Sequence, residues 1–326
     1  MIYSVVGYYA LILGLISGSI LTYFSVQNFR NSEILDTKIL SLSFLQLFFV
    51  VISFFGLVLS FVVSDFSNET VFNNSHTTKP LFYKITGTWG NHEGSLLLWL
   101  LVLTLFVFIF LLRTNNQSIK YKILTTIFQQ IIIIGFFIFL LKTSNPFNYL
   151  FPIPEEGLGL NPILQDPALA IHPPILYLGY VGSSIIFSSA LAATSLRMVS
   201  GSWATHIKNW TLVSWIFLTL GILLGSIWAY YELGWGGFWF WDPVENVSLM
   251  PWLALTTLLH CCVPFHSKQY CVFDVQPLNP PPGVKITGAS GSILAGAGRI
   301  QVRTSLPSKY TSIVRLLRLT IRLTHL

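Results

Sequence analysis

The chain has 326 residues, of which 53% are hydrophobic and only 9% are charged, and its formal net charge is +6 at pH 7. A typical soluble domain carries about 25% charged residues, so this chain has far too little polar surface to cover a water-soluble core. The composition excludes a soluble enzyme or binding module and indicates an integral membrane protein.

Apolar segments long enough to cross a membrane recur along the chain. A transmembrane helix needs roughly 20 mostly apolar residues, and these segments are continuously apolar without alternation, which favours helices over a β-barrel. We predict an all-α, polytopic transmembrane helical bundle of about seven helices. The predicted spans lie near 4–26, 39–64, 95–112, 121–141, 173–196, 210–230 and 248–265.

The basic residues of the connections predict the orientation, because loops on the cytoplasmic or matrix side are enriched in Lys and Arg. The amino terminus and the connection at 231–247 are therefore expected to face the outside of a bacterial or organellar inner membrane. Seven Lys and Arg fall in the connections 27–38, 113–122 and 197–208, whereas two fall in 65–94, 143–171 and 231–247.

The composition divides the chain into a membrane region, 1–265, and a tail, 266–326. Within the tail, residues 276–298 are rich in Pro, Gly, Ser and Ala, and residues 299–326 carry basic charge with no acid. No further span can be drawn there. A basic helix lying on a membrane surface and a disordered basic tail both fit this segment.

The connection at 231–247 packs five large aromatic rings into seven positions. Trp and Tyr form anchoring belts at membrane interfaces, but belts are spread over many helices, and here two glycines let the backbone bend sharply or approach a ligand. We predict an outward-facing platform for a flat ligand. Its rings are those of Trp235, Phe238, Trp239, Phe240 and Trp241.

The platform is followed by a pattern that is typical of a helix start. Asp242 can cap the helix, Pro243 suits its first position, and Glu245 at the third position can close a capping box. A catalytic carboxylate pair is the alternative interpretation. We predict the structural role, in which these residues fix where the aromatic segment ends.

Two histidines stand out by their predicted depth. His172 precedes two prolines, which disfavour a helix before them, so it is expected at the outer surface, facing the same space as the aromatic segment. His260 lies roughly 25 Å along the helix that begins at Pro243, inside the bilayer. An ionisable residue inside a membrane span indicates a functional site by default, and the neutral imidazole of His260 could ligate iron. The structural alternative is a neutral imidazole that is hydrogen-bonded to a neighbouring helix.

A third histidine lies in a second dense segment, Trp-Gly-Asn-His-Glu-Gly-Ser-Leu-Leu-Leu-Trp, at 89–99. Asn91 or Ser95 can cap the helix that starts here, and this capping accounts for the segment without a ligand. The alternative is that His92 and Glu93 form a ligand or proton-handling pair.

Three motifs together resemble the CcmF family, the heme-handling proteins of cytochrome c maturation within the tryptophan-rich WWD superfamily. They are the aromatic segment Trp-Gly-Gly-Phe-Trp-Phe-Trp-Asp-Pro-Val-Glu-Asn, the segment at 89–99, and Leu-Gln-Asp-Pro-Ala-Leu-Ala-Ile-His-Pro-Pro. The likeness runs from about residue 1 to 262. Within the family the chain is most similar to CcmFN, the amino-terminal fragment of the split plant mitochondrial protein.

The resemblance implies a component of the system I cytochrome c heme lyase, which holds heme on the outer face for covalent attachment to apocytochrome c. It implies a transient heme at the aromatic segment and a b-type heme within the membrane, and it assigns no catalytic residue to this chain. Phe238 stands where many relatives carry Trp. The implied heme-binding residues are Trp235, Phe238, Trp239, Trp241 and Asp242, with His172 as a ligand of the outer heme iron and His260 of the b-type heme iron.

The resemblance also implies partners and a location. A carboxy-terminal CcmF fragment would supply the second axial ligands, and a CcmH-like thiol protein, the heme chaperone CcmE and apocytochrome c would act with it. The implied location is the mitochondrial inner membrane, with the aromatic segment facing the intermembrane space; the bacterial inner membrane is the alternative.

Two other functions stay open: a transporter that carries heme across the membrane, and a b-type quinone-oxidising subunit.

Overall fold

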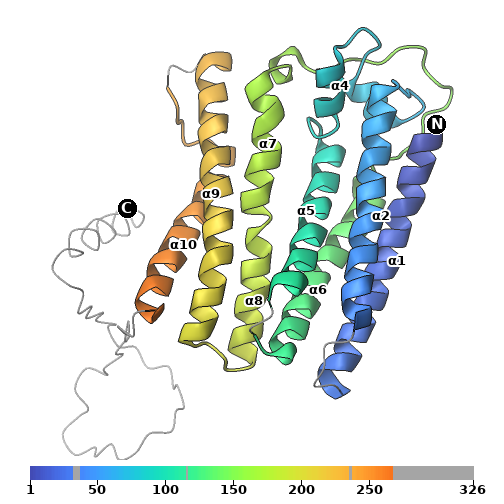
Figure 1. Cartoon of the computed structure of the whole chain (residues 1–326). Helices are drawn as coiled ribbons and strands as arrows, with labels where there is room; N and C mark the ends of the chain where they lie inside the picture. The colour runs from blue at the N-terminus through green and yellow to red at the C-terminus, as the bar shows by residue number, and fades with distance from the viewer. Residues whose placement is uncertain (32–36, 115–116, 235–236, 267–326) are drawn as a thin grey trace, which may run out of the picture. The chain divides into compact units, whose positions relative to one another are not determined.

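The computed structural model describes residues 1–31, 37–114, 117–234 and 237–266, and within these it is built from helices, as predicted (Figure 1). Trp235 and the tail beyond residue 266 lie outside the described residues. The helices are α1 (Ile2–Asn31), α2 (Thr37–Val62), α3 (Glu69–Asn74), α4 (Leu81–Gly87), α5 (His92–Arg113), α6 (Ile119–Thr143), the 3-10 helix η1 (Pro162–Leu164), α7 (Pro167–Tyr180), α8 (Ser183–Ser195), α9 (Gly201–Glu232) and α10 (Pro243–His266).

Six helical stretches in the described part of the chain are long and apolar enough to cross a membrane, which agrees with six of the predicted spans. The seventh predicted span, 248–265, is the greater part of α10. This helix begins at Pro243, carries Glu245 in its first turn, and is not among the six. The six are Ile2–Arg30, Thr37–Val62, His92–Arg113, Ile119–Thr143, Pro167–Ser195 and Gly201–Glu232.

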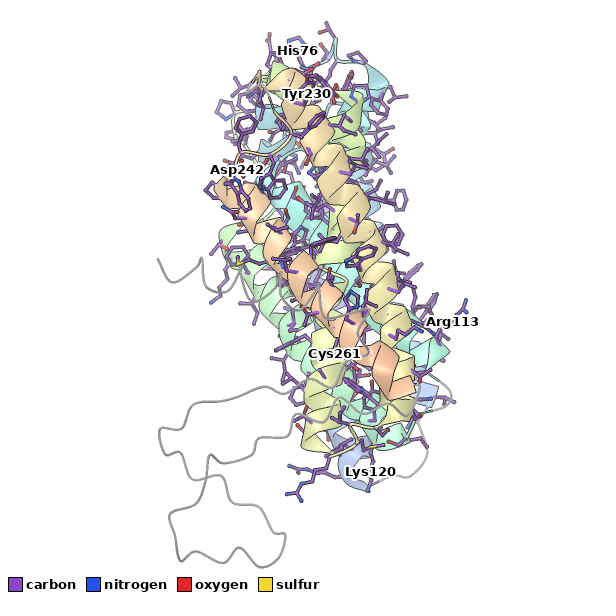
Figure 2. The ribbon with its side chains drawn as sticks, turned by 90° about the vertical axis from the view of Figure 1, so that its left-hand side faces the viewer. His76, Arg113, Lys120, Tyr230, Asp242 and Cys261 are labelled. Carbon is purple, nitrogen blue, oxygen red and sulfur yellow. The ribbon has the colours of Figure 1, made fainter. Side chains whose placement is uncertain are left out.

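Neighbouring helices pack side by side along most of their length (Figure 1). α1 packs against α2 and α6, α2 against α5, α6 against α8, α7 against α9, and α9 against α10. Figure 2 shows His76 and Tyr230 at one end of this bundle and Lys120 at the other, with Arg113 between them on the side of Lys120. His76 and Lys120, from connections that were predicted to lie on opposite faces of the membrane, are thus at opposite ends of the bundle.

The span predicted at 173–196 is two helices, and its start differs from the prediction. α7 begins at Pro167 because Asp166 caps it: Oδ1 of Asp166 accepts hydrogen bonds from the backbone N–H of Ala168 at 2.8 Å and of Leu169 at 3.0 Å. His172 consequently lies inside the helix and not at its entrance.

The two prolines that were expected to exclude helix lie within α7. Pro174 has no N–H to donate to the carbonyl of Ala170 four residues earlier. The indole N–H of Trp89 donates to this carbonyl at 2.9 Å, so a side chain from the start of α5 replaces the missing helical hydrogen bond. The segment at 89–99 thus holds α7 in place.

Candidate functional site

His172 lies half-buried between α7 and α9, roughly 8 Å along α7 from Pro167. The imidazole is therefore packed between two helices, and not at the entrance of the helix as the two prolines had indicated. Nδ1 of the imidazole is 2.7 Å from the backbone carbonyl oxygen of Gly221. A carbonyl oxygen can only accept a hydrogen bond, so Nδ1 carries the proton and Nε2 keeps a free lone pair.

Two glycines of α9 make this placement of His172 possible. A Cβ atom on Gly225 would lie 2.6 Å from Cε1 of His172, and one on Gly221 would lie 2.5 Å from Cα of Leu176. The absence of both side chains lets α9 approach α7 closely, and the imidazole lies against Gly225. Sequence reasoning missed these positions, although a pair of glycines four residues apart in a span is a known signal of close helix packing.

The end of this helix pair that carries Tyr231 is tied by a hydrogen bond between side chains. The hydroxyl of Tyr231 donates to Oδ1 of Asp166 at 2.6 Å, the same oxygen that caps α7. α9 therefore holds α7, and with it His172, at two places: at the two glycines and at Tyr231.

The rings of the aromatic segment pack in pairs and stay partly exposed. The ring of Phe238 stacks on that of Tyr230, with centroids 4.3 Å apart and planes at 11°, while Trp239 and Trp241 meet edge to face at 5.9 Å. Trp241 is 68% exposed and has a φ of 58°, a backbone conformation that is uncommon for a bulky residue. Such a conformation persists only where the surrounding structure holds it.

Asp242 and Glu245 form the predicted capping box, which is confirmed. Oδ1 of Asp242 accepts the N–H of Glu245 at 2.6 Å, and Oε2 of Glu245 accepts the N–H of Asp242 at 3.4 Å and of Phe240 at 2.8 Å. Both carboxylates are therefore engaged with the backbone. They shape the end of the aromatic segment and the start of α10.

α10 packs against α9 through a face that does not include His260. The indole N–H of Trp252 donates to Thr219 and that of Trp215 donates to Thr256, each at 2.8 Å. His260 is exposed, and it belongs to a row of exposed side chains spaced three or four residues apart, which we call the open stripe of α10. The open stripe consists of Val247, Met250, Ala254, Thr257 and His260.

The two predicted heme ligands are not brought together. His172 lies against Gly221 and Gly225 of α9, whereas α10 has already reached the level of Trp215 at Thr256, four residues before His260. Nowhere in the described ranges do three or more His, Cys, Asp or Glu gather as metal ligands would. Each histidine would therefore belong to a separate site.

His92 and Glu93 lie at the start of α5, where the predicted cap is confirmed. The side chain of Asn91 accepts the N–H of Gly94 at 2.8 Å. His92 is exposed, with Nδ1 3.9 Å from Oε1 of Glu93, and it lines a cavity of about 420 Å³ between this segment and α7. A ligand or proton-handling role for the pair stays a prediction.

The sequence is similar to those of known cytochrome c assembly proteins. The family model described as "Cytochrome C assembly protein" matches residues 89–273. The cytochrome c-type biogenesis protein CycK of Bradyrhizobium diazoefficiens is 52% identical over 258 residues, which are 78% of this chain and 39% of CycK. CcmF of Escherichia coli is 49% identical over 209 residues, which are 64% of this chain and 32% of CcmF.

The fold is similar to a solved structure named cytochrome c heme lyase CcmF. The two superpose with a TM-score of 0.70 and 28% sequence identity, over 82% of this chain and 43% of that one. The chain thus spans about two fifths, or less, of the length of these relatives. The helices of membrane-spanning length and the matched family model lead to one conclusion: this is a multi-pass membrane protein that belongs to the cytochrome c assembly protein family.

Proposed function

We propose that this chain is the component of a cytochrome c heme lyase that holds heme on the outer face of the membrane for covalent attachment to apocytochrome c. The name of the similar solved structure supports this activity. The observation that carries the proposal is the hydrogen bond from Nδ1 of His172 to the carbonyl of Gly221. A histidine that ligates iron commonly donates its other ring N–H to such an acceptor, which fixes the ring and its tautomer.

The residues around His172 and in the aromatic segment suit a planar cargo. In this proposal Trp235, Phe238, Trp239 and Trp241 provide ring faces for the porphyrin, and Asp242 holds the end of the segment. The exposure of the Phe238 and Trp241 side chains supports it. The work of this chain is then to orient the heme, since the heme itself supplies the reactive groups.

His260 is proposed to ligate a b-type heme within the membrane, which would supply electrons that keep the outer heme iron reduced. An exposed imidazole on the open stripe of α10 supports this assignment, because a lone polar group facing lipid is costly and calls for a partner. The second axial ligand of each heme is proposed to come from a carboxy-terminal CcmF fragment that covers the stripe.

The other proposed partners are a CcmH-like thiol protein, the chaperone CcmE that delivers heme, and apocytochrome c. The proposed location is the mitochondrial inner membrane with the aromatic segment facing the intermembrane space, and the bacterial inner membrane is the alternative. The bacterial relatives favour the alternative. Both place the aromatic segment on the face opposite to the basic loops.

The test is co-expression of the chain with a carboxy-terminal CcmF fragment, comparing His172→Ala with His260→Ala. We expect His260→Ala to remove a stable b-type absorbance spectrum. His172→Ala should leave that spectrum and abolish covalent heme attachment to cytochrome c, and added imidazole should partly restore attachment in His172→Gly.

The proposal fails if both variants leave the spectrum and the attachment unchanged. It also fails if the reconstituted complex shows no heme spectrum at all. Transfer of labelled heme across proteoliposomes by the same complex, with no attachment activity, would favour the transporter instead.

A further inference from the structure

One tryptophan of the aromatic segment has a polar group that the protein does not satisfy. The indole N–H of Trp239 is buried, and no described residue accepts a hydrogen bond from it. Of the other described tryptophans, only Trp228, on α9, shares this property. Four others donate to acceptors within the chain: Trp89, Trp203, Trp215 and Trp252.

A buried donor without an acceptor is rare in folded proteins, and an absent ligand is one of the explanations for it. Trp239 lies among the rings that are proposed to contact heme, where such a ligand would bind. The only strong hydrogen-bond acceptors on the periphery of heme are its two propionate carboxylates. An indole is a donor only and an ionised carboxylate is an acceptor only, so the two are chemically matched.

Cations that usually meet such carboxylates are missing from this part of the chain. Residues 231–247 contain no Lys or Arg, and the two lysines of the other outer connections are engaged elsewhere. Nζ of Lys79 donates to the carbonyl of Asn74 at 3.1 Å, and burial lowers the pKa of Lys79 to about 8. Nζ of Lys84 donates to Oγ of Ser64 at 2.8 Å. A neutral N–H is the kind of donor that remains.

We propose that Trp239 binds a propionate carboxylate of the heme through its indole N–H, in addition to presenting its ring. This inference rests on the proposed function. Hydrogen bonds to a charged acceptor are stronger than those between neutral groups, so one neutral donor orients the heme edge without a cation. Gly234, with a φ of 64°, and Gly237 both precede the rings of Phe238, Trp239 and Trp241 and give the backbone conformational freedom there.

The test separates the N–H of Trp239 from its ring. Trp239→Phe keeps an aromatic face and loses the donor, and heme dimethyl ester keeps the macrocycle and loses both carboxylate charges. The full chain in complex with its carboxy-terminal partner is titrated with each compound and followed by absorbance. We expect the wild type to prefer heme over the ester by about tenfold, and Trp239→Phe to lose this preference by weakening heme alone.

Trp241→Phe is the matched control, because it makes the same substitution at a ring that is 68% exposed. Its heme-to-ester affinity ratio should equal that of the wild type. The inference is overturned if Trp239→Phe retains the preference or weakens both compounds equally. A wild type that binds both compounds equally also overturns it, while a wild type that binds neither overturns the proposed function itself.

Discussion

His172 and His260 are the two candidate ligands of this chain, and their surroundings are opposite. His172 is held between two helices of the same chain, with Nδ1 bonded to Gly221 and the ring against Gly225. His260 is exposed on the open stripe of α10. The chain therefore fixes the side chain of one candidate ligand by its own contacts, whereas the other candidate ligand is left open to a further segment.

This difference has a physical basis in what each position requires. A ligand that receives a mobile cargo benefits from a fixed ring and tautomer before the cargo arrives, because orientation is then not lost at each transfer. A ligand inside a membrane has no water to satisfy it, so it gains most from the helix that covers it. The roles proposed for His172 and His260 correspond to these two situations.

The comparison between the two histidines predicts its largest effect for Gly225→Val, which should disturb His172 and leave His260 unaffected. The new Cβ would overlap the ring of His172, with 2.6 Å to its Cε1, and the ring must move. A displacement of about 1 Å can cost about 100-fold in rate, so heme attachment to cytochrome c should fall by about that factor while the b-type spectrum stays.

Gly135→Val is the matched control for this change, because nothing lies within 4 Å of a Cβ at Gly135. It should leave attachment near the wild-type level. If Gly225→Val supports normal attachment, or if it removes the b-type spectrum as well, then Gly225 does not position His172 selectively.

A smaller effect is expected for the surface around His260, from Ala254→Trp on the open stripe. A bulky ring in a packed helix contact costs about 1–3 kcal/mol, so recovery of the carboxy-terminal fragment with this chain should drop by about tenfold or more. The b-type spectrum should fall with it. Thermal unfolding of the chain alone should not change, since Ala254 is exposed.

The control for the open stripe is Ile131→Trp, at a position of α6 that is 60% exposed. It adds a similar ring to a different helix and should leave recovery of the fragment unchanged. Equal losses from the two substitutions would mean that the open stripe is not the contact surface.

The sequence was sufficient for features that depend on local chemistry. Continuous apolar runs predicted the helices, and the spacing of Asp242 and Glu245 predicted their capping box, because both follow from a few adjacent residues. It was insufficient where a distant group changes the outcome. The prolines of α7 disfavour helix locally, but the cap of Asp166 and the indole of Trp89 stabilise it, so His172 is half-buried.

The burial of His172 could not be predicted for a related reason. It depends on which helix lies opposite, and the approach of α9 depends on two glycines whose contacts span about fifty residues of sequence: 49 positions separate His172 from Gly221. Single-sequence patterns describe one helix at a time. The glycine pair indicated close packing, but not the identity of the side chain that fills the space.

The smallest effect concerns whether the acidic end of the aromatic segment is structural, as the capping box indicates. Asp242→Ala removes the cap of α10 and should cost about 1 kcal/mol of stability, whereas Asp242→Asn retains a good capping side chain and should cost less. Thermal unfolding measures the cost, and heme attachment is measured in parallel. A catalytic carboxylate would make Asn as damaging to attachment as Ala; a structural one leaves Asn close to wild type, because the amide oxygen can still accept the N–H of Glu245.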